Sequence, residues 1–284
     1  MNYRHHYHAG GAADLLKHMV LAALLRRLLV KPRPLCVLDT HAGAGVYGLD
    51  DEMARKTGEA SRGVARLWGA RGLPEALADL MRVVAAFNPD GALRVYPGSP
   101  ALARALLRAD DRLVACELQP GEAHKLQTSL AAPTPGPGRT GECRVAVHVR
   151  DGYEALGALL PPVERRGLVV VDPPYERPDE FAAALAGLQR GHARWPTGCY
   201  LLWYPIRGPV AAGKLHAALL AGSMRRILCV ELRAGAEPGD GSGVIVVNPP
   251  WQVDEALRDA LPALAGHLGE RGADATRVEW LVGE

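Results

Sequence analysis

The run Val171-Asp172-Pro173-Pro174-Tyr175 carries the clearest chemistry in the chain. Two successive prolines hold the backbone extended and remove two N–H donors, so their carbonyl groups turn outward. The carboxylate of Asp172 only accepts hydrogen bonds, and beside those carbonyls it can hold a planar exocyclic NH₂ group. The ring of Tyr175 can stack on the base that carries this amine. The pattern therefore predicts Asp172, Pro173 and Tyr175 as catalytic residues that hold the amino group of a nucleobase.

A glycine-rich turn, Leu38-Asp39-Thr40-His41-Ala42-Gly43-Ala44-Gly45, follows an apolar run near the N-terminus. Glycines let the backbone approach a ligand closely and leave N–H groups free to donate. No Gly-Lys-Ser/Thr follows, so the turn is not a phosphate-binding P-loop, and it lacks the full G-x-G-x-x-G fingerprint. By itself the turn fits either a nucleotide-binding loop or an ordinary turn.

Two acidic residues, Glu117 and Asp151, each follow a strand-like run. A carboxylate at Glu117 suits the two hydroxyls of a ribose, and Asp151 with Gly152 suits the edge of an adenine. Asp151 is equally well placed to be a helix N-cap. The ordered set of glycine turn, two acids and Asp172 predicts a nucleotide-like cofactor at the carboxyl ends of parallel strands.

A second run, Asn248-Pro249-Pro250-Trp251, has the same form as the Asp172 motif. It comes after a strand predicted to run in the opposite direction, so we expect it at the opposite ends of the strands from the cofactor. We expect it to be a structural turn rather than a catalytic motif.

Histidines and cysteines do not form a metal-binding pattern in this sequence. The histidines at positions 5, 6, 8 and 18 have no matching cysteine or acidic cluster at ligand spacing, so no metal is expected. The five cysteines are widely spaced and none forms a C-x-x-C pair, which is typical of reduced core thiols in a cytosolic protein.

The elements that position these residues are short apolar strands that alternate with helices. Strands are predicted at 35–39, 112–117, 144–149, 167–172 and 199–203. Such continuous apolar runs fit strands that are buried on both faces of a parallel sheet. The segments 227–232 and 244–248 indicate an antiparallel hairpin at one edge of the sheet, and 276–282 a further strand. Helices are predicted at 152–160, 178–189 and 252–268, and Ser99 is predicted to cap a helix. The fold class is therefore α/β, an open doubly wound sheet.

The spacing between Gly45 and Glu117 indicates an insertion. It is 72 residues, whereas the corresponding acid of a nucleotide-binding unit follows its glycine loop by about 20. Residues 50–95 are therefore interpreted as an inserted helical subdomain, with 1–49 and 96–284 forming the main domain. Residues 14–25 predict a helix with an apolar face that docks against the sheet, and residues 1–18 are interpreted as a lid over the site.

Composition excludes several classes of protein. The chain has 284 residues with 48% hydrophobic and 23% charged residues, which is ordinary for a globular protein. No apolar run approaches the roughly 20 residues of a membrane span, and no secretory signal is visible, so we expect a cytoplasmic protein. The formal net charge is only +2, but residues 1–35 carry +5 and residues 235–284 carry −6. The N-terminal part is therefore the one suited to face phosphates.

These motifs, together with Tyr3-Arg4-His5, Ala13-Asp14-Leu15-Leu16-Lys17-His18, YPGSP and LLWYP, strongly resemble the bacterial 23S rRNA adenine-N6-methyltransferases of the RlmJ type. The resemblance covers nearly the whole chain and implies a Rossmann-like class I methyltransferase fold. It also implies S-adenosylmethionine as the cofactor and a 23S rRNA hairpin as the partner of a monomeric enzyme. The family's target is adenine 2030, so the resemblance implies that nucleotide.

The resemblance also assigns individual residues. Its implied cofactor contacts are His18, His41, Ser99, Glu117, Asp151 and Gly152, and its implied catalytic residue is Asp172. We expect Gly43 of the glycine turn and Asp172 to bind the cofactor as well. Its implied contacts with the RNA are Tyr3, His5 and Lys17, and we expect Arg4 to lie near a phosphate. Two other functions stay open on the residues alone, a DNA adenine-N6 methyltransferase and a non-catalytic RNA-binding protein that keeps the fold. An oxidoreductase fits less well because the dinucleotide fingerprint is incomplete.

Overall fold

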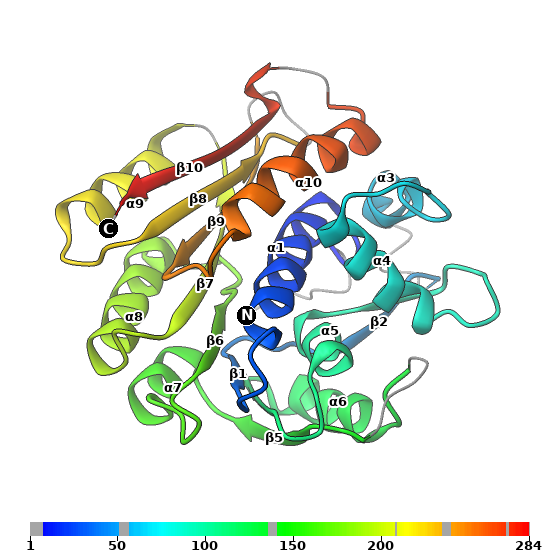
Figure 1. Cartoon of the computed structure of the whole chain (residues 1–284), viewed down its shortest axis with the longest axis horizontal. Helices are drawn as coiled ribbons and strands as arrows, with labels where there is room; N and C mark the ends of the chain where they lie inside the picture. Colours follow the sequence, from blue (N-terminus) through cyan, green and yellow to red (C-terminus); the bar gives the residue numbers. More distant parts are fainter. Residues whose placement is uncertain are drawn as a thin grey trace.

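The computed structural model describes residues 8–50, 57–135, 141–207, 209–234, 240–270 and 273–283. Its centre is a sheet of eight strands in the order β10-β8-β9-β7-β6-β1-β4-β5, which crosses Figure 1 diagonally. The strands are β1 (Cys36–Asp39), β4 (Arg112–Glu117), β5 (Arg144–Val149), β6 (Gly167–Val171), β7 (Cys199–Ile206), β8 (Ile227–Leu232), β9 (Gly241–Val247) and β10 (Thr276–Val282).

The five strands from β5 to β7 pair in parallel, and β9, β8 and β10 pair antiparallel. The predicted α/β class and its mostly parallel sheet are thus confirmed, including the strand at 276–282. The hairpin of β8 and β9 is not the edge, however, because β10 pairs with β8 and lies outside it. Strand β7 also runs on past the predicted end at residue 203, because its last residues pair with the start of β9.

Helices cover both faces of the sheet (Figure 1). The core on one face is built with α1 (Ala12–Leu29), α4 (Glu75–Ala86), α5 (Ser99–Leu106), α6 (Pro120–Ala131) and α10 (Val253–Leu268). The core on the other face is built with α7 (Gly152–Ala158), α8 (Glu180–Arg194) and α9 (Pro209–Ala221). Alternating faces follow from right-handed crossovers on either side of β1, which leave a crevice where the strand order reverses.

Helix α1 is an internal helix rather than the one-sided helix that the sequence predicts. Every residue from Asp14 to Leu25 is buried. Its apolar residues pack against the sheet on one side and against α4, α5 and α10 on the others. Two of its charged residues, Asp14 and Lys17, are buried with it, so they need partners inside the protein.

A small hairpin frames the region of the predicted insertion. Strands β2 (Val46–Gly48) and β3 (Val95–Pro97) pair antiparallel, and neither was predicted. Between them lie α3 (Glu59–Arg62), the 3₁₀ turn η2 (Val64–Arg66) and α4. In the part of the chain that the structure describes, no helix has the length and hydropathy to cross a membrane.

Candidate active site

Two cavities meet at the carboxyl ends of β1 and β6, where the loops after these strands carry the predicted site residues. Both cavities open to solvent, and with that open space included the first has a volume of about 1050 Å³ and the second about 1720 Å³. Lys17, Asp172 and Pro174 line both cavities and therefore form their junction. The predicted cofactor residues that line the first cavity are His41, Gly43, Ser99, Glu117, Asp151, Gly152 and Asp172. The side chains of the second cavity that could meet a substrate include His8, Glu59, Arg62, Arg66, Tyr175, Trp203 and Arg207.

The glycine turn and Glu117 are joined directly. Gly43 and Gly45 have φ values of +61° and +82°, which glycine adopts without strain. The Gly43 N–H donates to one oxygen of the Glu117 carboxylate at 2.9 Å, and the Gln119 N–H donates to the other at 2.8 Å. Burial raises the pKa of Glu117. Each oxygen keeps a lone pair, so the carboxylate can still accept from a pair of hydroxyls.

Asp151 is the N-cap of α7, as the alternative interpretation of the sequence predicts. Its carboxylate accepts from the N–H groups of Tyr153 at 2.7 Å and Glu154 at 3.1 Å. Gly152 follows in close contact with the backbone of Thr40, and a Cβ there would collide with it. The glycine is therefore required for the close packing of this turn on the loop after β1, at the wall of the first cavity.

Two other predicted contacts have unexpected partners. Ser99 is not the N-cap of α5, since Gly98 holds that position and accepts the first helical hydrogen bond from Leu102. Ser99 is instead the first residue of the helix, and its side chain bonds to Asp39. The Nδ1 atom of His41 forms a hydrogen bond with Thr40 Oγ1 at 2.8 Å. Burial lowers the pKa of His41, so its imidazole is neutral at pH 7.

Asp39 supports the site from behind Ser99, and sequence reasoning missed it: it lines neither cavity but bonds to Ser99, which lines the first. It ends β1 and is 1% exposed, and its Oδ2 has no hydrogen-bond partner among the described residues. Burial raises its pKa to about 6, against the bond from Ser99, and the nearby charge of Asp172 adds to the rise. An acid that ends the first strand before a glycine turn was a visible signal, but the sequence does not show that this acid is buried.

The raised pKa of Asp39 predicts a pH-dependent loss of stability in the protein without ligands. The pKa of Asp39 is higher in the folded protein than in the unfolded chain. The resulting contribution to the free energy of unfolding is therefore complete below about pH 4 and is lost as the pH rises through about 6. Asp39→Asn removes this titration. We therefore expect the variant to gain on the order of 1–3 kcal/mol over the wild type between pH 4.5 and pH 8. Urea unfolding at both pH values measures the change, and equal differences at the two would contradict it.

Lys17 and Asp172 form a buried ion pair at the junction. Lys17 Nζ lies 2.5 Å from Asp172 Oδ2 and 2.9 Å from Asp14 Oδ1. The Lys17 side chain is 4% exposed and that of Asp172 is 12% exposed. Burial alone would lower the pKa of Lys17, but the two carboxylates raise it well above its usual value, so the ammonium persists. The structure thus directs Lys17 toward the predicted catalytic carboxylate.

Tyr175 is held firmly beside this junction. Its φ is +51°, an unusual value for a non-glycine residue, and its hydroxyl donates to the backbone oxygen of Trp203 at 2.8 Å. Its ring packs against Phe181 at 4.7 Å and against Trp203 at 5.5 Å between centroids. The ring lines the second cavity, so the two prolines and Tyr175 place an aromatic wall next to Asp172.

The remaining predicted residues fall into two groups. His18 lies in α1 with its side chain fully buried, bonded through Nδ1 to the Tyr96 hydroxyl at 2.9 Å, and it lines neither of the two cavities. Tyr3, Arg4 and His5 lie outside the described residues. The described chain begins at His8, whose Nδ1 pairs with Glu59 at 2.8 Å.

The second proline motif closes a turn and lines neither of the two cavities that meet at Asp172. Asn248 has a φ of +52°, and its side-chain amide donates to the carbonyls of Pro196 at 2.7 Å and Gly198 at 2.9 Å. It follows β9, which runs antiparallel to β7, so it lies at the amino ends of the parallel strands, opposite to the ends where Asp172 lies. The amide is fully used in closing a turn.

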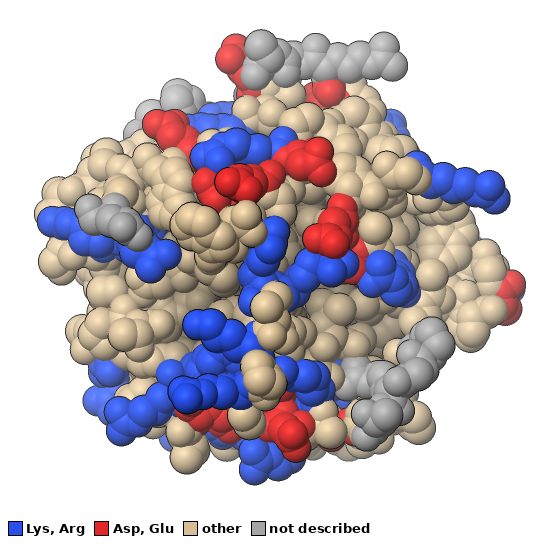
Figure 2. Space-filling view, in the orientation of Figure 1, with Lys and Arg blue, Asp and Glu red and all other residues tan. Residues whose placement is uncertain are grey.

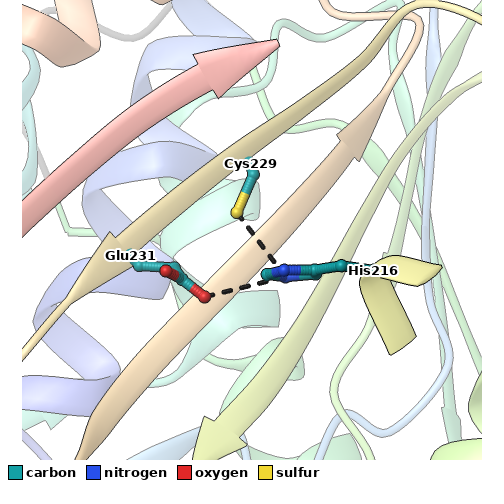
Figure 3. A group of neighbouring side chains, drawn as sticks. All are labelled: His216, Cys229 and Glu231. Atoms are coloured by element: carbon teal, nitrogen blue, oxygen red, sulfur yellow. Dashed lines mark hydrogen bonds and ion pairs between the residues drawn. The ribbon is translucent and has the colours of Figure 1, made fainter. Parts of the chain in front are cut away.

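One group of metal-ligand side chains exists in the described part of the chain, at His216, Cys229 and Glu231 (Figure 3). The Tyr204 hydroxyl lies 2.8 Å from His216 Nε2 and 2.8 Å from Glu231 Oε1, and 3.5 Å from Cys229 Sγ. Burial raises the pKa of the Cys229 thiol to about 12, so it stays protonated. These side chains satisfy one another's hydrogen bonds and form a buried network between the sheet and α9.

A further pair in the first cavity was also missed by sequence reasoning. The Tyr153 hydroxyl donates to Glu180 Oε1 at 2.7 Å, and Glu180 is buried although it starts helix α8. Both side chains line the first cavity. No motif marks them, because they come from the starts of two helices that meet only in the folded protein.

Comparison with known proteins gives a consistent set of relatives. The family described as "Ribosomal RNA large subunit methyltransferase D, RlmJ" matches residues 32–282. Ribosomal RNA large subunit methyltransferase J of Escherichia coli (strain K12) is 40% identical over 288 residues, and that of Haemophilus influenzae (strain Rd) is 36% identical over 289, each with both chains fully covered. The solved structure of protein LPL1258 from Legionella pneumophila is similar with a TM-score of 0.85 and 31% identity, covering 98% of this chain and 99% of that chain.

Proposed function

The chain belongs to the RlmJ family of ribosomal RNA large subunit methyltransferases, and from this premise we propose that it transfers a methyl group from S-adenosylmethionine to N6 of an adenine in 23S rRNA. The observation that carries the proposal is the position of Asp172 where the two cavities meet. One cavity suits a nucleotide-like cofactor and the other a flat base, and the carboxylate faces both.

The residues of the first cavity fit S-adenosylmethionine. Glu117 keeps free lone pairs for ribose hydroxyls, Asp151 and Gly152 form a flat wall suited to adenine, and the glycine turn allows close approach of the methionine part. The buried Asp39 places negative charge near the site, which favours a cationic ligand. When bound, the cofactor supplies a methyl group on a sulfonium centre, and no metal ion is needed for that chemistry.

The protein's part in catalysis is mainly positioning. Asp172 and the carbonyl of Pro173 hold the two N6 hydrogens, so that the nitrogen lone pair faces the first cavity. Lys17 fixes the Asp172 carboxylate through the ion pair, and the ammonium offsets the cost of burying that negative charge. The aminium formed on the base is acidic, so no strong base is required before attack.

The second cavity offers aromatic and basic groups to an unpaired adenine and its phosphates. Tyr175 can stack on the base, and Arg62, Arg66 and Arg207 line the same cavity. Figure 2 shows Lys and Arg side chains gathered across the middle and lower parts of the face that Figure 1 presents. The family resemblance implies that Tyr3 and His5, which lie outside the described residues, contact the RNA, and we expect Arg4 to lie near a phosphate.

We propose that the substrate is a local hairpin of 23S rRNA and that the enzyme acts as a monomer in the cytoplasm. The first test uses S-adenosylmethionine with a deuterated methyl group, protein-free 23S rRNA, and DNA of the same hairpin sequence. Mass spectrometry of the digested nucleosides should find labelled N6-methyladenosine from the RNA and none from the DNA. Label on cytosine, or on DNA in preference to RNA, would contradict the proposed substrate.

Cofactor binding is tested separately by calorimetry. We expect saturable binding of S-adenosylmethionine to the protein and no binding of NAD. Binding of RNA without binding of S-adenosylmethionine would favour a non-catalytic RNA-binding protein, and binding of NAD alone would favour an oxidoreductase.

A further inference from the structure

The loops at the amino ends of the parallel strands carry basic residues that the proposed mechanism does not use. Lys31 and Arg33 lie in the loop before β1, Arg108 in the loop before β4, and Arg165 and Arg166 in the loop before β6. Strands β6, β1 and β4 are parallel neighbours in the sheet, so these loops lie side by side at one end of it. These five residues form a surface that we term the basic end.

Contacts between the loops restrain the basic end. Arg108 donates to the carbonyl oxygens of Lys31 at 3.0 Å and of Arg33 at 2.9 Å. Arg166 donates to the same oxygen of Arg33 at 2.6 Å. A proline follows each of Lys31 and Arg33 and restricts the backbone between them. The loop before β1 is therefore tied to both neighbouring loops through its carbonyl groups, and its two basic side chains are left exposed.

Three cations of the basic end are exposed without a counter-charge. Lys31, Arg33 and Arg165 pair with no carboxylate in the described part of the chain. Burial lowers the pKa of the Arg166 guanidinium, and the nearby charge of Arg108 lowers it further. Like charges gathered in this way repel one another, so an anion that binds among them is attracted by all of them.

The acids of the same three loops do not neutralise this surface. Asp111 is fully buried and pairs with Arg108 at 3.0 Å. The side chain of Glu164 is 7% exposed and pairs with Arg112 at 2.8 Å. Asp110 is the one exposed acid in these loops, all of whose residues the structure describes. The charge that the basic end presents to solvent is therefore predominantly positive.

The basic end lies at the opposite end of the strands from the candidate active site. Arg33 precedes β1 and Asp39 ends it, and six residues of extended chain span about 20 Å. No cation of the basic end lines either of the cavities that meet at Asp172. An adenine seated beside Asp172 therefore does not contact this surface.

The arrangement suits several phosphates of a nucleic acid backbone. Neighbouring strands lie about 4.8 Å apart, so the three loops spread their cations over about 10 Å. A nucleic acid strand carries a phosphate about every 3.4 Å along its helix axis, so more than one phosphate faces a surface of this width. Four of the five cations are arginines, whose planar guanidinium can donate to two phosphate oxygens at once.

We propose that the basic end binds the phosphate backbone of a second helix of 23S rRNA while the target adenine occupies the second cavity. The inference rests on the proposed function, because the RNA at the basic end is a continuation of the proposed substrate. Phosphate contacts position RNA without reading its sequence. The second contact adds affinity for the long rRNA and none for the isolated hairpin. The restrained loops increase this gain, since little conformational entropy is lost on binding.

The test compares two variants that each lose two exposed positive charges. Arg33→Gln with Arg165→Gln changes the basic end. The matched control is Arg190→Gln with Lys214→Gln, which changes the net charge equally on α8 and α9. None of these four residues lines either cavity. Thermal unfolding checks that both variants are folded.

The Kd is measured for protein-free 23S rRNA and for the isolated target hairpin over a range of salt concentrations, together with kcat/KM on the hairpin. For 23S rRNA, we expect the Arg33 and Arg165 variant to raise the Kd about tenfold at about 100 mM salt. The slope of log Kd against log salt concentration should fall by about two, one for each lost phosphate contact. On the hairpin, its Kd and kcat/KM should stay within about twofold of the wild type, and the control should match the wild type on both RNAs.

Three outcomes would overturn the proposal. The first is equal affinity of the two variants for 23S rRNA, which would make the basic end a merely solvated surface. The second is an equal loss on the hairpin, which would place these cations in the field of the active site. The third is weaker binding to phosphatidylserine vesicles with unchanged binding to RNA, which would assign the surface to a membrane. If the wild type methylated neither RNA while the two salt slopes still differed, the proposed function would fail and RNA binding at the basic end would stand.

Discussion

Replacing Asp172 by alanine is expected to reduce kcat about 10²–10³-fold, the loss typical of one oriented charged group at a reacting centre. The carboxylate is the acceptor at the junction of the two cavities, and removing it leaves the amine of the base without its main partner. Lys17 keeps its second partner Asp14 at 2.9 Å, so the variant retains a paired ammonium. The affinity for S-adenosylmethionine should change less than about tenfold, since most groups of the first cavity remain.

The two measurements are single-turnover methylation of the RNA hairpin and calorimetric titration with S-adenosylmethionine. Asn248→Ala is the matched control, because it alters the first residue of the other proline motif. Its side chain bonds only to carbonyls of a turn, so kcat should stay within about twofold of the wild type. The free energy of unfolding should fall by about 1–3 kcal/mol, because two carbonyls lose a donor and alanine must adopt a positive φ. An inactive Asn248→Ala together with an active Asp172→Ala would contradict this assignment and place the catalytic role in the Asn248 motif.

Much of this arrangement can be predicted from the sequence, because the ends of buried parallel strands are recognisable in it. Apolar runs such as Gly167–Val171 are long enough to identify a buried strand, and the polar residue after each one must emerge at a common edge. Glu117, Asp151 and Asp172 therefore could be placed together before their contacts were known. The prolines after Asp172 further restrict the backbone, so the motif keeps its local form in the structure.

The contacts that complete the site depend on tertiary packing, and sequence patterns do not encode them. The predicted apolar face of α1 is correct, but the burial of its other face forces Asp14 and Lys17 inward as a pair. Ser99 turns to Asp39 because the backbone of Gly98 already starts the helix. Trp203 stands beside Asp172 only through the pairing of β6 with β7, which lie about 30 residues apart in the chain.

The buried Lys17 is the second residue whose change should have a large effect. We expect Lys17→Met to lower the free energy of unfolding by about 3–5 kcal/mol, because it leaves the carboxylates of Asp14 and Asp172 buried without their cation. Methylation at pH 7 should fall on the order of 100-fold, since an uncompensated buried carboxylate takes up a proton and then no longer acts only as an acceptor.

The pH dependence separates this role from a merely structural one. In the wild type the pKa of Lys17 is raised, so the stability from the pair is complete below about pH 10 and is lost only as the pH rises above it. The ion pair therefore adds no ionisation to the wild-type pH–rate profile between pH 6 and 9. In Lys17→Met two like charges share a buried site, which moves their proton uptake to higher pH. We expect the variant to show a new ionisation, with its rate recovering toward pH 9.

The profile is measured under single-turnover conditions from pH 6 to 9, at temperatures below the unfolding transition of the variant. Lys214→Met is the matched control, because Lys214 is exposed on α9 and away from both cavities. That variant should keep the stability and the pH–rate profile of the wild type. If Lys17→Met lost stability but kept the shape of the wild-type profile with a uniformly reduced rate, the ammonium would hold α1 in place without controlling the charge of Asp172. A recovering profile would instead tie the buried pair to the acceptor that the reaction needs.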